Sequence, residues 1–355
     1  MIWIFLIGGL LLSLLCNELL LRFSQSLGIR NKNDVVIRWS NQSKPSLGGV
    51  SFFAVFVFAT FVVIMLLDQV NIFHNEIYGI EFTGLFGASC LAFLMGLADD
   101  AYNTRPYFKL FVQITCGVFL ISTGTVIDLF HQTIPDQIIT VLWVVAVMNS
   151  LNMLDNMDGI AGTTVCFLLL TCMFSRGSLS GTQTDIWALI IMAIIGALIG
   201  FLRFNIFPSK IFMGDAGSQF IGLVVSFFAI KFLWNVGSRI EQPSWSGFLV
   251  TLVVFTPAAA DTLTVVINRM RRGRSPMVGG KDHTTHHLVY AGLNDKQVWY
   301  VFTLISIFST LLGIFMIDMV WKGVLLPVAL AAIYFLVVFA FLFRVTIKYP
   351  EPKKD

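Results

Sequence analysis

Apolar stretches about as long as a membrane-crossing helix recur from the first residues of the chain to the last. A helix needs about 20 apolar residues to cross the ~30 Å hydrocarbon layer of a bilayer, and its backbone must satisfy its own hydrogen bonds there. Short polar segments separate these stretches. The pattern predicts an all-α, polytopic membrane protein with about eleven transmembrane helices, at residues 2–22, 47–67, 82–98, 107–124, 137–153, 159–175, 185–203, 215–234, 246–267, 298–319 and 323–345.

The composition leads to the same class. Of the 355 residues, 57% are hydrophobic and only 12% are charged, whereas about a quarter of the residues in a soluble domain are charged. The stretch from Met1 to Leu21 lacks a basic leader and a small-residue cleavage site, so we expect a first span rather than a removable signal. We see no internal repeat or linker and expect a single integral membrane domain over residues 1–355, with its motifs at about 44–290. The five cysteines show no metal-ligand spacing, so neither disulfides nor a cysteine metal site is expected.

The distribution of Lys and Arg predicts the orientation in the membrane. Of the 23 basic residues, only Arg176, Lys231, Arg239 and Lys322 fall in or beside one set of alternate loops. The others fall in the opposite set or in the C-terminal tail. Because basic residues concentrate in cytoplasmic loops, the N-terminus is predicted to be outside and the C-terminus in the cytoplasm. An odd number of spans agrees with this assignment.

Chemically useful polar residues gather at the predicted cytoplasmic ends of the spans. They occur in five segments, at 44–49, 99–100, 149–159, 205–218 and 279–287, which are rich in Asp, Asn, Lys, His and Gly. Ionisable residues at a membrane boundary are costly unless they are solvated or paired. Their concentration on one side therefore predicts an active site facing the cytoplasm.

Some of these residues also have a purely structural interpretation. Asp99 and Asp100 would suit a solvated helix end, and Asp215 with Ser218 would suit a helix cap. A cap, however, does not explain the polar residues just before Asp215.

The polar residues of the 149–159 segment are harder to explain by a structural role alone. Asn152, Asp155 and Asp158 are spaced by three, so a continuing helix would place all three on one face.

As a set, the residues suit the chemistry of a diphosphate. Phosphoryl transfer depends mainly on neutralising charge, which Mg²⁺ does with few carboxylate ligands and several waters. Lys109, with Gln113 one turn later, can supply donors, as can His283, His286 and His287. The glycine-rich helix starts at 48–49, 159 and 214–217 are expected to present backbone N–H groups to phosphate.

Taken in order, these segments resemble the polyprenyl-phosphate N-acetylhexosamine-1-phosphate transferase family. The resemblance implies transfer of a sugar 1-phosphate from a UDP-N-acetylhexosamine to undecaprenyl phosphate in the bacterial inner membrane, with Mg²⁺ (or Mn²⁺ in its place) as cofactor and UMP as product. It implies a membrane-lipid environment and no nucleic-acid partner, and it leaves a homodimer open. The product would initiate a cell-surface polysaccharide such as O-antigen or capsule.

The resemblance also implies roles for individual residues. The catalytic group would comprise the adjacent aspartates, one of which would act on the acceptor phosphate, and the two aspartates of the 149–159 segment: Asp99, Asp100, Asp155 and Asp158. Asp215, with Asn152, would hold the metal, and Phe212 would stack on uracil. The remaining binding residues would be Lys44, Lys109, Gln113, Asn152, Asn205, Ser218, His283, His286 and His287. A strong base is not required, because a phosphate monoester with a second pKa of about 6 is already largely ionised at neutral pH; Asp99 would then orient the nucleophile or hold metal. Pro257 and Asp261 fit a break in the ninth span.

The chain departs from the family pattern at two places. Asn156 stands where the Asp-Gly-Leu-Asp-Gly motif has a glycine, and the histidine motif reads His283-Thr284-Thr285-His286-His287. These departures leave the donor sugar open and favour the branch that initiates O-antigen or capsule chains.

Three alternatives remain beside this interpretation. They are phospho-MurNAc-pentapeptide transfer in peptidoglycan synthesis, a transporter of an anionic substrate, and a CDP-alcohol phosphotransferase. A transporter would place its charges near the bilayer midplane rather than at helix ends. The CDP-alcohol signature Asp-Gly-x-x-Ala-Arg is matched only in part, at residues 158–162.

Overall fold

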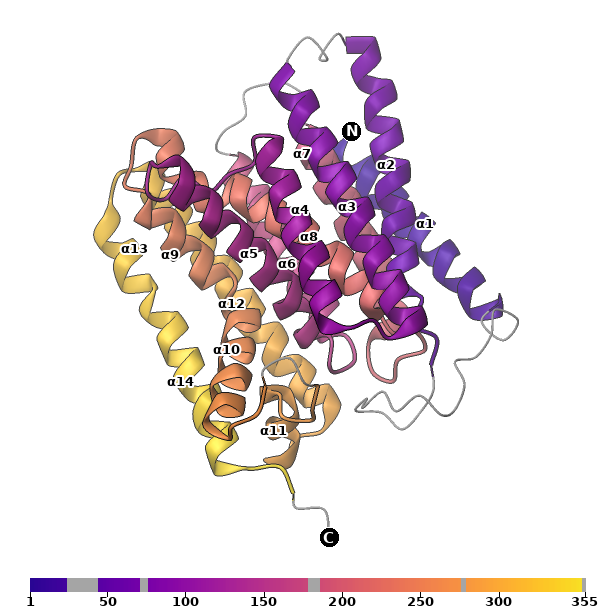
Figure 1. Cartoon of the computed structure of the whole chain (residues 1–355), viewed down its shortest axis with the longest axis vertical. Helices are drawn as coiled ribbons and strands as arrows, with labels where there is room; N and C mark the ends of the chain where they lie inside the picture. The colour runs from indigo at the N-terminus through magenta and orange to yellow at the C-terminus, as the bar shows by residue number, and fades with distance from the viewer. Residues whose placement is uncertain (24–43, 71–75, 178–185, 276–278, 353–355) are drawn as a thin grey trace.

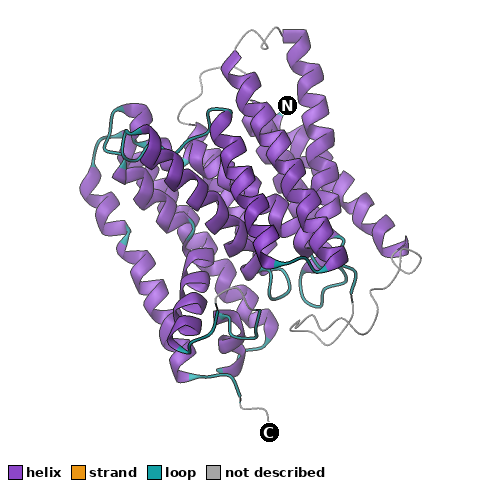
Figure 2. Cartoon of the chain, viewed as in Figure 1, coloured by secondary structure: helices purple, strands orange, loops and turns teal. Residues whose placement is uncertain are grey.

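The chain folds into a bundle of helices (Figure 1). The computed structural model describes residues 1–23, 44–70, 76–177, 186–275 and 279–352. Over these residues it contains helices and turns but no strand, as Figure 2 shows. Three of the basic residues used to predict the orientation, Arg30, Lys32 and Arg38, lie outside the described residues, as do Lys353 and Lys354.

The helices coincide closely with the predicted spans. They are α1 (Ile2–Phe23), α2 (Gly48–Val70), α3 (Glu76–Tyr102), α4 (Pro106–Ser122), α5 (Thr133–Leu154), α6 (Ile160–Gly177), α7 (Ile186–Asn205), α8 (Gly214–Phe232), α9 (Trp245–Val254), α10 (Thr256–Arg271), α11 (Thr284–Tyr290), α12 (Asp295–Trp321), α13 (Leu325–Ala331) and α14 (Ile333–Lys348). In the described part of the chain, eight segments are long and apolar enough to cross a membrane, α13 and α14 counting as one. A ninth span arises if the bent pair α9–α10 counts as one, and α4 and α6 are shorter apolar helices. The fold is therefore that of a polytopic, all-helical membrane protein.

The ninth predicted span is broken, as the sequence predicted. The axes of α9 and α10 meet at 83°, with Phe255 between them and Pro257 in the first turn of α10. Proline is tolerated in a first turn because its missing N–H would have no helical partner there. The break turns α10 back along α5, α12 and α14.

Helices α7 and α8 form the centre of the bundle. Both are apolar around their circumference and buried along almost their whole length, as expected for helices without a polar face. Helix α8 packs against α2, α3, α5 and α6, and α7 against α1, α2 and α6. Helices α1 and α14 lie towards opposite edges of the bundle in Figure 1, and most of their side chains are not buried, as in lipid-facing helices.

Glycines allow α2 and α3 to approach the first turn of α8 very closely. A Cβ added at Gly49 would collide with the backbone of Gly217, and one added at Gly96 would collide with the carbonyl of Asp215. The start of α8 is thereby clamped between two other helices. This contact fixes the position of Asp215.

We predict that Gly49→Ala lowers the free energy of unfolding by about 1–3 kcal/mol, as at other overpacked sites, and therefore lowers the melting temperature of the purified protein. The matched control is Gly8→Ala, because a Cβ added at Gly8 has nothing within 4 Å and alanine favours a helix interior. Melting temperatures in one detergent would be compared. Equal melting temperatures for the two variants would contradict the tight crossing.

Candidate active site

The polar segments meet at one end of the bundle, around a cavity of about 940 Å³. Figure 1 shows that the loops from which they come lie together at the lower end. Twelve of the fifteen predicted site residues line the cavity: Lys44, Asp99, Lys109, Gln113, Asn152, Asp155, Asp158, Asn205, Phe212, Asp215, His283 and His286. Most of the residues that the sequence predicted for the site therefore line one cavity.

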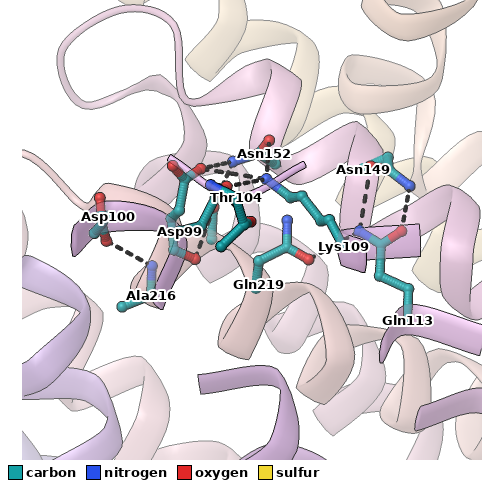
Figure 3. Close-up of polar contacts among 11 residues, drawn as sticks. Asp99, Asp100, Thr104, Lys109, Gln113, Asn149, Asn152, Ala216 and Gln219 are labelled. Carbon is teal, nitrogen blue, oxygen red and sulfur yellow. Dashed lines mark hydrogen bonds and ion pairs between the residues drawn. The ribbon is translucent and has the colours of Figure 1, made fainter. Parts of the chain in front are cut away.

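The ammonium group of Lys109 is the centre of the site. It donates to Asp99 Oδ2 at 3.1 Å and to Asn152 Oδ1 at 3.1 Å, and lies 3.5 Å from Asp215 Oδ1. Asn152 in turn donates to Asp215 Oδ1 at 2.5 Å and to Ser218 at 2.8 Å. These side chains come from α3, α4, α5 and α8, and Figure 3 shows Asp99, Lys109 and Asn152 converging. Ser218 lies behind Asn152 and supports it from outside the cavity lining.

Asp99 accepts hydrogen bonds from three donors. Its Oδ1 accepts from the backbone N–H and the hydroxyl of Thr104, at 2.8 and 2.7 Å, while Oδ2 accepts from Lys109. A carboxylate held by three donors is stabilised in its charged form. Its geometry suits the positioning of Lys109 better than the removal of a proton.

Asp100 points elsewhere. Its Oδ2 accepts a 2.9 Å hydrogen bond from the backbone N–H of Ala216, in the first turn of α8 (Figure 3). It lies outside the cavity lining. Carboxylates favour helix N-termini, where N–H groups lack helical partners. The structure thus separates the adjacent aspartates: Asp99 faces the cavity and Asp100 binds the start of α8.

Gln113 is buried and carries the polar network below Lys109. It donates to Gln219 at 2.9 Å and to Asn149 at 3.2 Å, and accepts from Asn149 at 2.8 Å. Gln219 is a member of this network that the sequence analysis does not predict. It lies one turn after Asp215 on α8, a spacing that places the two side chains on one face of the helix.

The acidic turn at 155–159 does not continue α5, as the spacing of its aspartates had suggested. The helix ends at Leu154, and Gly159 adopts a φ of +78°, a left-handed conformation that glycine adopts without strain. Asp158 accepts from the backbone N–H of Ser209 at 3.0 Å. Asp155 and Asp158 nevertheless both line the cavity.

Asn205 braces this turn against the 205–213 loop. Its side chain accepts from Gly159 N–H at 3.0 Å and donates to the Ile211 carbonyl at 2.9 Å. Both halves of its amide are therefore engaged with backbone.

The prediction that glycine-rich helix starts present N–H groups to phosphate was wrong at 48–49 and at 159, and at 214–217 the Ala216 N–H is already taken. The N–H groups of Gly48 and Gly49 donate to the carbonyls of Phe212 and Met213, at 3.0 and 2.9 Å, rather than facing the cavity. That of Gly159 donates to Asn205, and Asp100 takes the Ala216 N–H. The glycines serve close packing and turn geometry, which the sequence could not distinguish from phosphate binding.

Lys44 and Phe212 form the opposite wall. The Lys44 ammonium lies 5.3 Å from the centre of the Phe212 ring and donates to Ser209 at 3.1 Å. A cation next to an aromatic face combines charge with a stacking surface. This pairing suits an aromatic base attached to a phosphate.

The histidine segment is anchored by a carboxylate inside the bent helix. Asp261 is fully buried, accepts from the backbone N–H and hydroxyl of Thr284 at 2.8 and 2.6 Å, and lies 2.9 Å from His283 Nδ1. Three polar partners satisfy a carboxylate that would otherwise be costly at this depth.

The three predicted histidines differ in environment. His283 and His286 line the cavity, whereas His287 binds the carbonyl of Tyr349 through Nδ1 at 2.6 Å and lies outside the lining. Burial, with the nearby His283, lowers the pKa of His286 to about 3. His286 is therefore neutral at physiological pH and does not contribute a cation.

An ion pair that the sequence did not predict lies beside the histidines. Arg269 donates to both oxygens of Asp282, at 2.8 and 2.6 Å, and both side chains are almost fully buried. Burial opposes the charge of Asp282, but the Arg269 guanidinium prevails and holds the pKa of Asp282 below its usual value. The spacing of 13 residues across a loop gave no sequence signal for this pair.

The site offers one carboxylate suited to a hard cation. Among the described residues, no three His, Cys, Asp or Glu side chains form a group that could hold a metal. Asp215 lines the cavity with its side chain 34% exposed, and the Lys109 ammonium already occupies a cation position between it and Asp99. Mg²⁺ commonly takes one or two protein carboxylates and completes its shell with water and phosphate, so these residues fit it. Asn152 directs its amide towards Asp215, Ser218 and Lys109 instead.

The fold and site define a polytopic membrane protein with a polar, charge-paired cavity at one end of its helices. The model of the glycosyl transferase family 4 matches residues 82–233. A decaprenyl-phosphate N-acetylglucosaminephosphotransferase of Mycolicibacterium smegmatis is 28% identical over 277 residues, which cover 72% of this chain and 68% of the relative. A Bacillus subtilis protein described as a probable undecaprenyl-phosphate N-acetylglucosaminyl 1-phosphate transferase is 26% identical, covering 72% and 70%. A phospho-N-acetylmuramoyl-pentapeptide-transferase of Streptococcus uberis is also 26% identical, covering 76% and 82%. The chain is thus similar to glycosyl transferase family 4 over this stretch, and to relatives that are named as polyprenyl-phosphate hexosamine-1-phosphate transferases.

We predict that acid destabilises the protein partly through His286. In the folded protein its pKa is about 3, against 6.5 when unperturbed, so between these values the unfolded chain binds a proton that the folded one does not. Stability is then lost as the pH falls from about 6.5 towards 3.

The variant His286→Gln removes this titration and can keep the hydrogen bond to the His283 N–H, since glutamine suits the same capping position. Its melting temperature should fall less than that of the wild type between pH 7 and pH 5. His131→Gln, at an exposed histidine, is the control and should follow the wild type. Parallel curves for all three proteins would refute the assignment.

Proposed function

We propose that the protein transfers an N-acetylhexosamine 1-phosphate from a UDP-sugar to undecaprenyl phosphate and releases UMP. The observation that carries this proposal is the Lys109 ammonium held among Asp99, Asn152 and Asp215 at the floor of the cavity. Phosphoryl transfer needs positioned charge more than covalent help. The lipid-linked product would start a surface polysaccharide, in keeping with the names of the relatives.

The proposed reaction is a direct displacement. An oxygen of the carrier phosphate forms a bond to the β-phosphorus of the UDP-sugar, and the bond from that phosphorus to the bridging oxygen breaks, so that UMP leaves. Lys109 would neutralise charge on the diphosphate, and Asp99 and Asn152 would hold its ammonium in place. Asp99 already accepts from three donors, and this geometry supports a mechanism in which no protein side chain acts as a base.

The nucleotide would lie against the wall formed by Lys44 and Phe212. There the uracil stacks on Phe212 and Lys44 faces the α-phosphate. Mg²⁺, bound at Asp215, would supply further charge neutralisation to the diphosphate.

The carrier lipid would approach between α4, α5 and α10. Apolar side chains from these helices, Leu110, Ala146 and Val266, line part of the cavity. Beyond them, Leu142 and Leu263 are exposed on the surface of the bundle. A polyprenyl chain needs an apolar path from the bilayer to the site, and the apolar residues on these helices support an approach from this side.

Two other functions are less well supported. A transporter would carry its charges at the midplane, whereas Asp99, Lys109, Asn152 and Asp215 all lie at helix ends. Phospho-MurNAc-pentapeptide transfer is the second; it would use the same floor of the cavity and differ in the sugar side.

The proposed orientation places the N-terminus outside, eleven spans across the bacterial inner membrane, and the cavity towards the cytoplasm. The described helices supply eleven spans if α9–α10 counts as one and α4 and α6 both cross. Fluorescent protein, which does not fold after export through the general secretion route, should fluoresce when fused after the C-terminus. Alkaline phosphatase fused at the same point should be inactive, and an active phosphatase would reverse the orientation.

We predict that Asp215→Asn lowers UMP release by at least 100-fold, because it removes the carboxylate that faces the diphosphate, while the protein remains folded. The assay uses purified protein, undecaprenyl phosphate, Mg²⁺ and a panel of UDP-N-acetylhexosamines, and identifies the lipid product by mass. The control is Asp318→Asn, at an exposed aspartate paired with Lys322, which should retain normal turnover. EDTA should stop the wild-type reaction and excess Mg²⁺ should restore it. Normal turnover by Asp215→Asn would refute the assignment.

A further inference from the structure

A hydrogen bond joins two walls of the cavity that are far apart in the sequence. The hydroxyl of Thr285 in α11 donates to Asn156 Oδ1 at 2.6 Å, across 129 residues of chain. The other half of the Asn156 amide donates to the Met153 carbonyl at 2.8 Å, at the end of α5. Both ends of the side chain are therefore fixed, and Thr285 is fully buried.

The two partners lie between residues that face the cavity. Asn156 stands between Asp155 and Asp158 in the acidic turn, and Thr285 stands between His283 and His286. The acidic turn follows α5, whereas α11 is a short helix after the bent α10. The Asn156–Thr285 hydrogen bond thus spans from one wall to the other.

On its far side, α11 has separate anchors. Asp261 holds its first turn, and His287 contacts the Tyr349 carbonyl. These contacts fix α11 to α10 and to the end of α14, but not to the acidic turn. Helix α10 in turn packs against α5, which leads into the acidic turn, and the Asn156–Thr285 hydrogen bond links the histidine segment to that turn directly.

We propose that the Asn156–Thr285 hydrogen bond is a positioning contact that sets the spacing between the acidic turn and the histidine segment, and thereby the affinity for the donor. The inference rests on the proposed function, because it takes the occupant to be a UDP-sugar. A nucleotide sugar is large enough to touch both walls, so its binding depends on their spacing. The carrier phosphate reaches the floor near Lys109 and Asp99, away from this contact.

The contact depends on the residue at which this chain departs from the family motif. A glycine at position 156, as the related motif has, provides no side-chain acceptor for Thr285. This chain therefore holds its two walls together by a bond that a glycine-containing turn cannot make.

The test compares Asn156→Gly, Thr285→Val and the double variant with the wild type. The KM and Kd for UDP-N-acetylglucosamine, and for whichever donor of the panel reacts fastest, are measured with the KM for undecaprenyl phosphate. Each single variant should raise the donor KM and Kd about 5- to 20-fold, as expected for one lost hydrogen bond at a binding wall. The value of kcat and the carrier KM should stay within about twofold.

Two further variants separate positioning from general damage. Thr285→Ser keeps the hydroxyl and should behave like the wild type. Thr115→Val removes an exposed threonine hydroxyl bonded within α4 and should have no effect. The double variant should be no worse than either single one, because both remove the same interaction.

Unchanged donor Kd in both single variants, or additive effects in the double variant, would overturn the proposal. If Asn156→Gly does not fold, the comparison of Thr285→Ser with Thr285→Val still decides it. Wild-type protein that binds the donor but makes no lipid-linked product would contradict the proposed function, and the Kd values would then decide on the positioning contact alone.

Discussion

The site depends on a single ammonium group shared by four helices. Lys109 of α4 contacts side chains of α3, α5 and α8, with both ends of its ion pair to Asp99 mostly shielded from water. Removing one member of a buried ion pair leaves an uncompensated charge, which typically costs about 3–5 kcal/mol. The interaction therefore specifies helix positions and site geometry together. Because two carboxylates face one ammonium, the floor of the cavity keeps a net negative charge that a metal cation can balance.

The second constraint is the broken helix. The bend between α9 and α10 brings Asp261 into the interior, where three partners from α11 satisfy it. An unbroken span would leave this carboxylate without those partners, at a large desolvation cost. The bend, the buried Asp261 and the histidine segment therefore depend on one another. Together they close one wall of the cavity.

The sequence predicted the helices well because their apolar lengths are imposed by the membrane. Most of the residues that it predicted for the site line the cavity, since polar side chains at helix ends have few other reasons to cluster. It did not reveal the direction of individual side chains. Asp99 and Asp100 are adjacent and chemically identical, and only the packing of α3 against α8 separates their roles. No periodic pattern in the sequence predicts contacts between separate segments, such as Arg269 with Asp282 and Asn156 with Thr285.

The adjacent aspartates also determine how the chain tolerates change. Asp100 ties the end of α3 to the start of α8 across 116 residues, and Asp99 and Asp215 sit on either side of that tie. The gap between them is set by direct contacts between α3 and α8, this hydrogen bond and the close approach of Gly96 among them, rather than by the chain between those positions. Loops at the far end of the bundle are thus free to lengthen, shorten or diverge without moving the reacting groups.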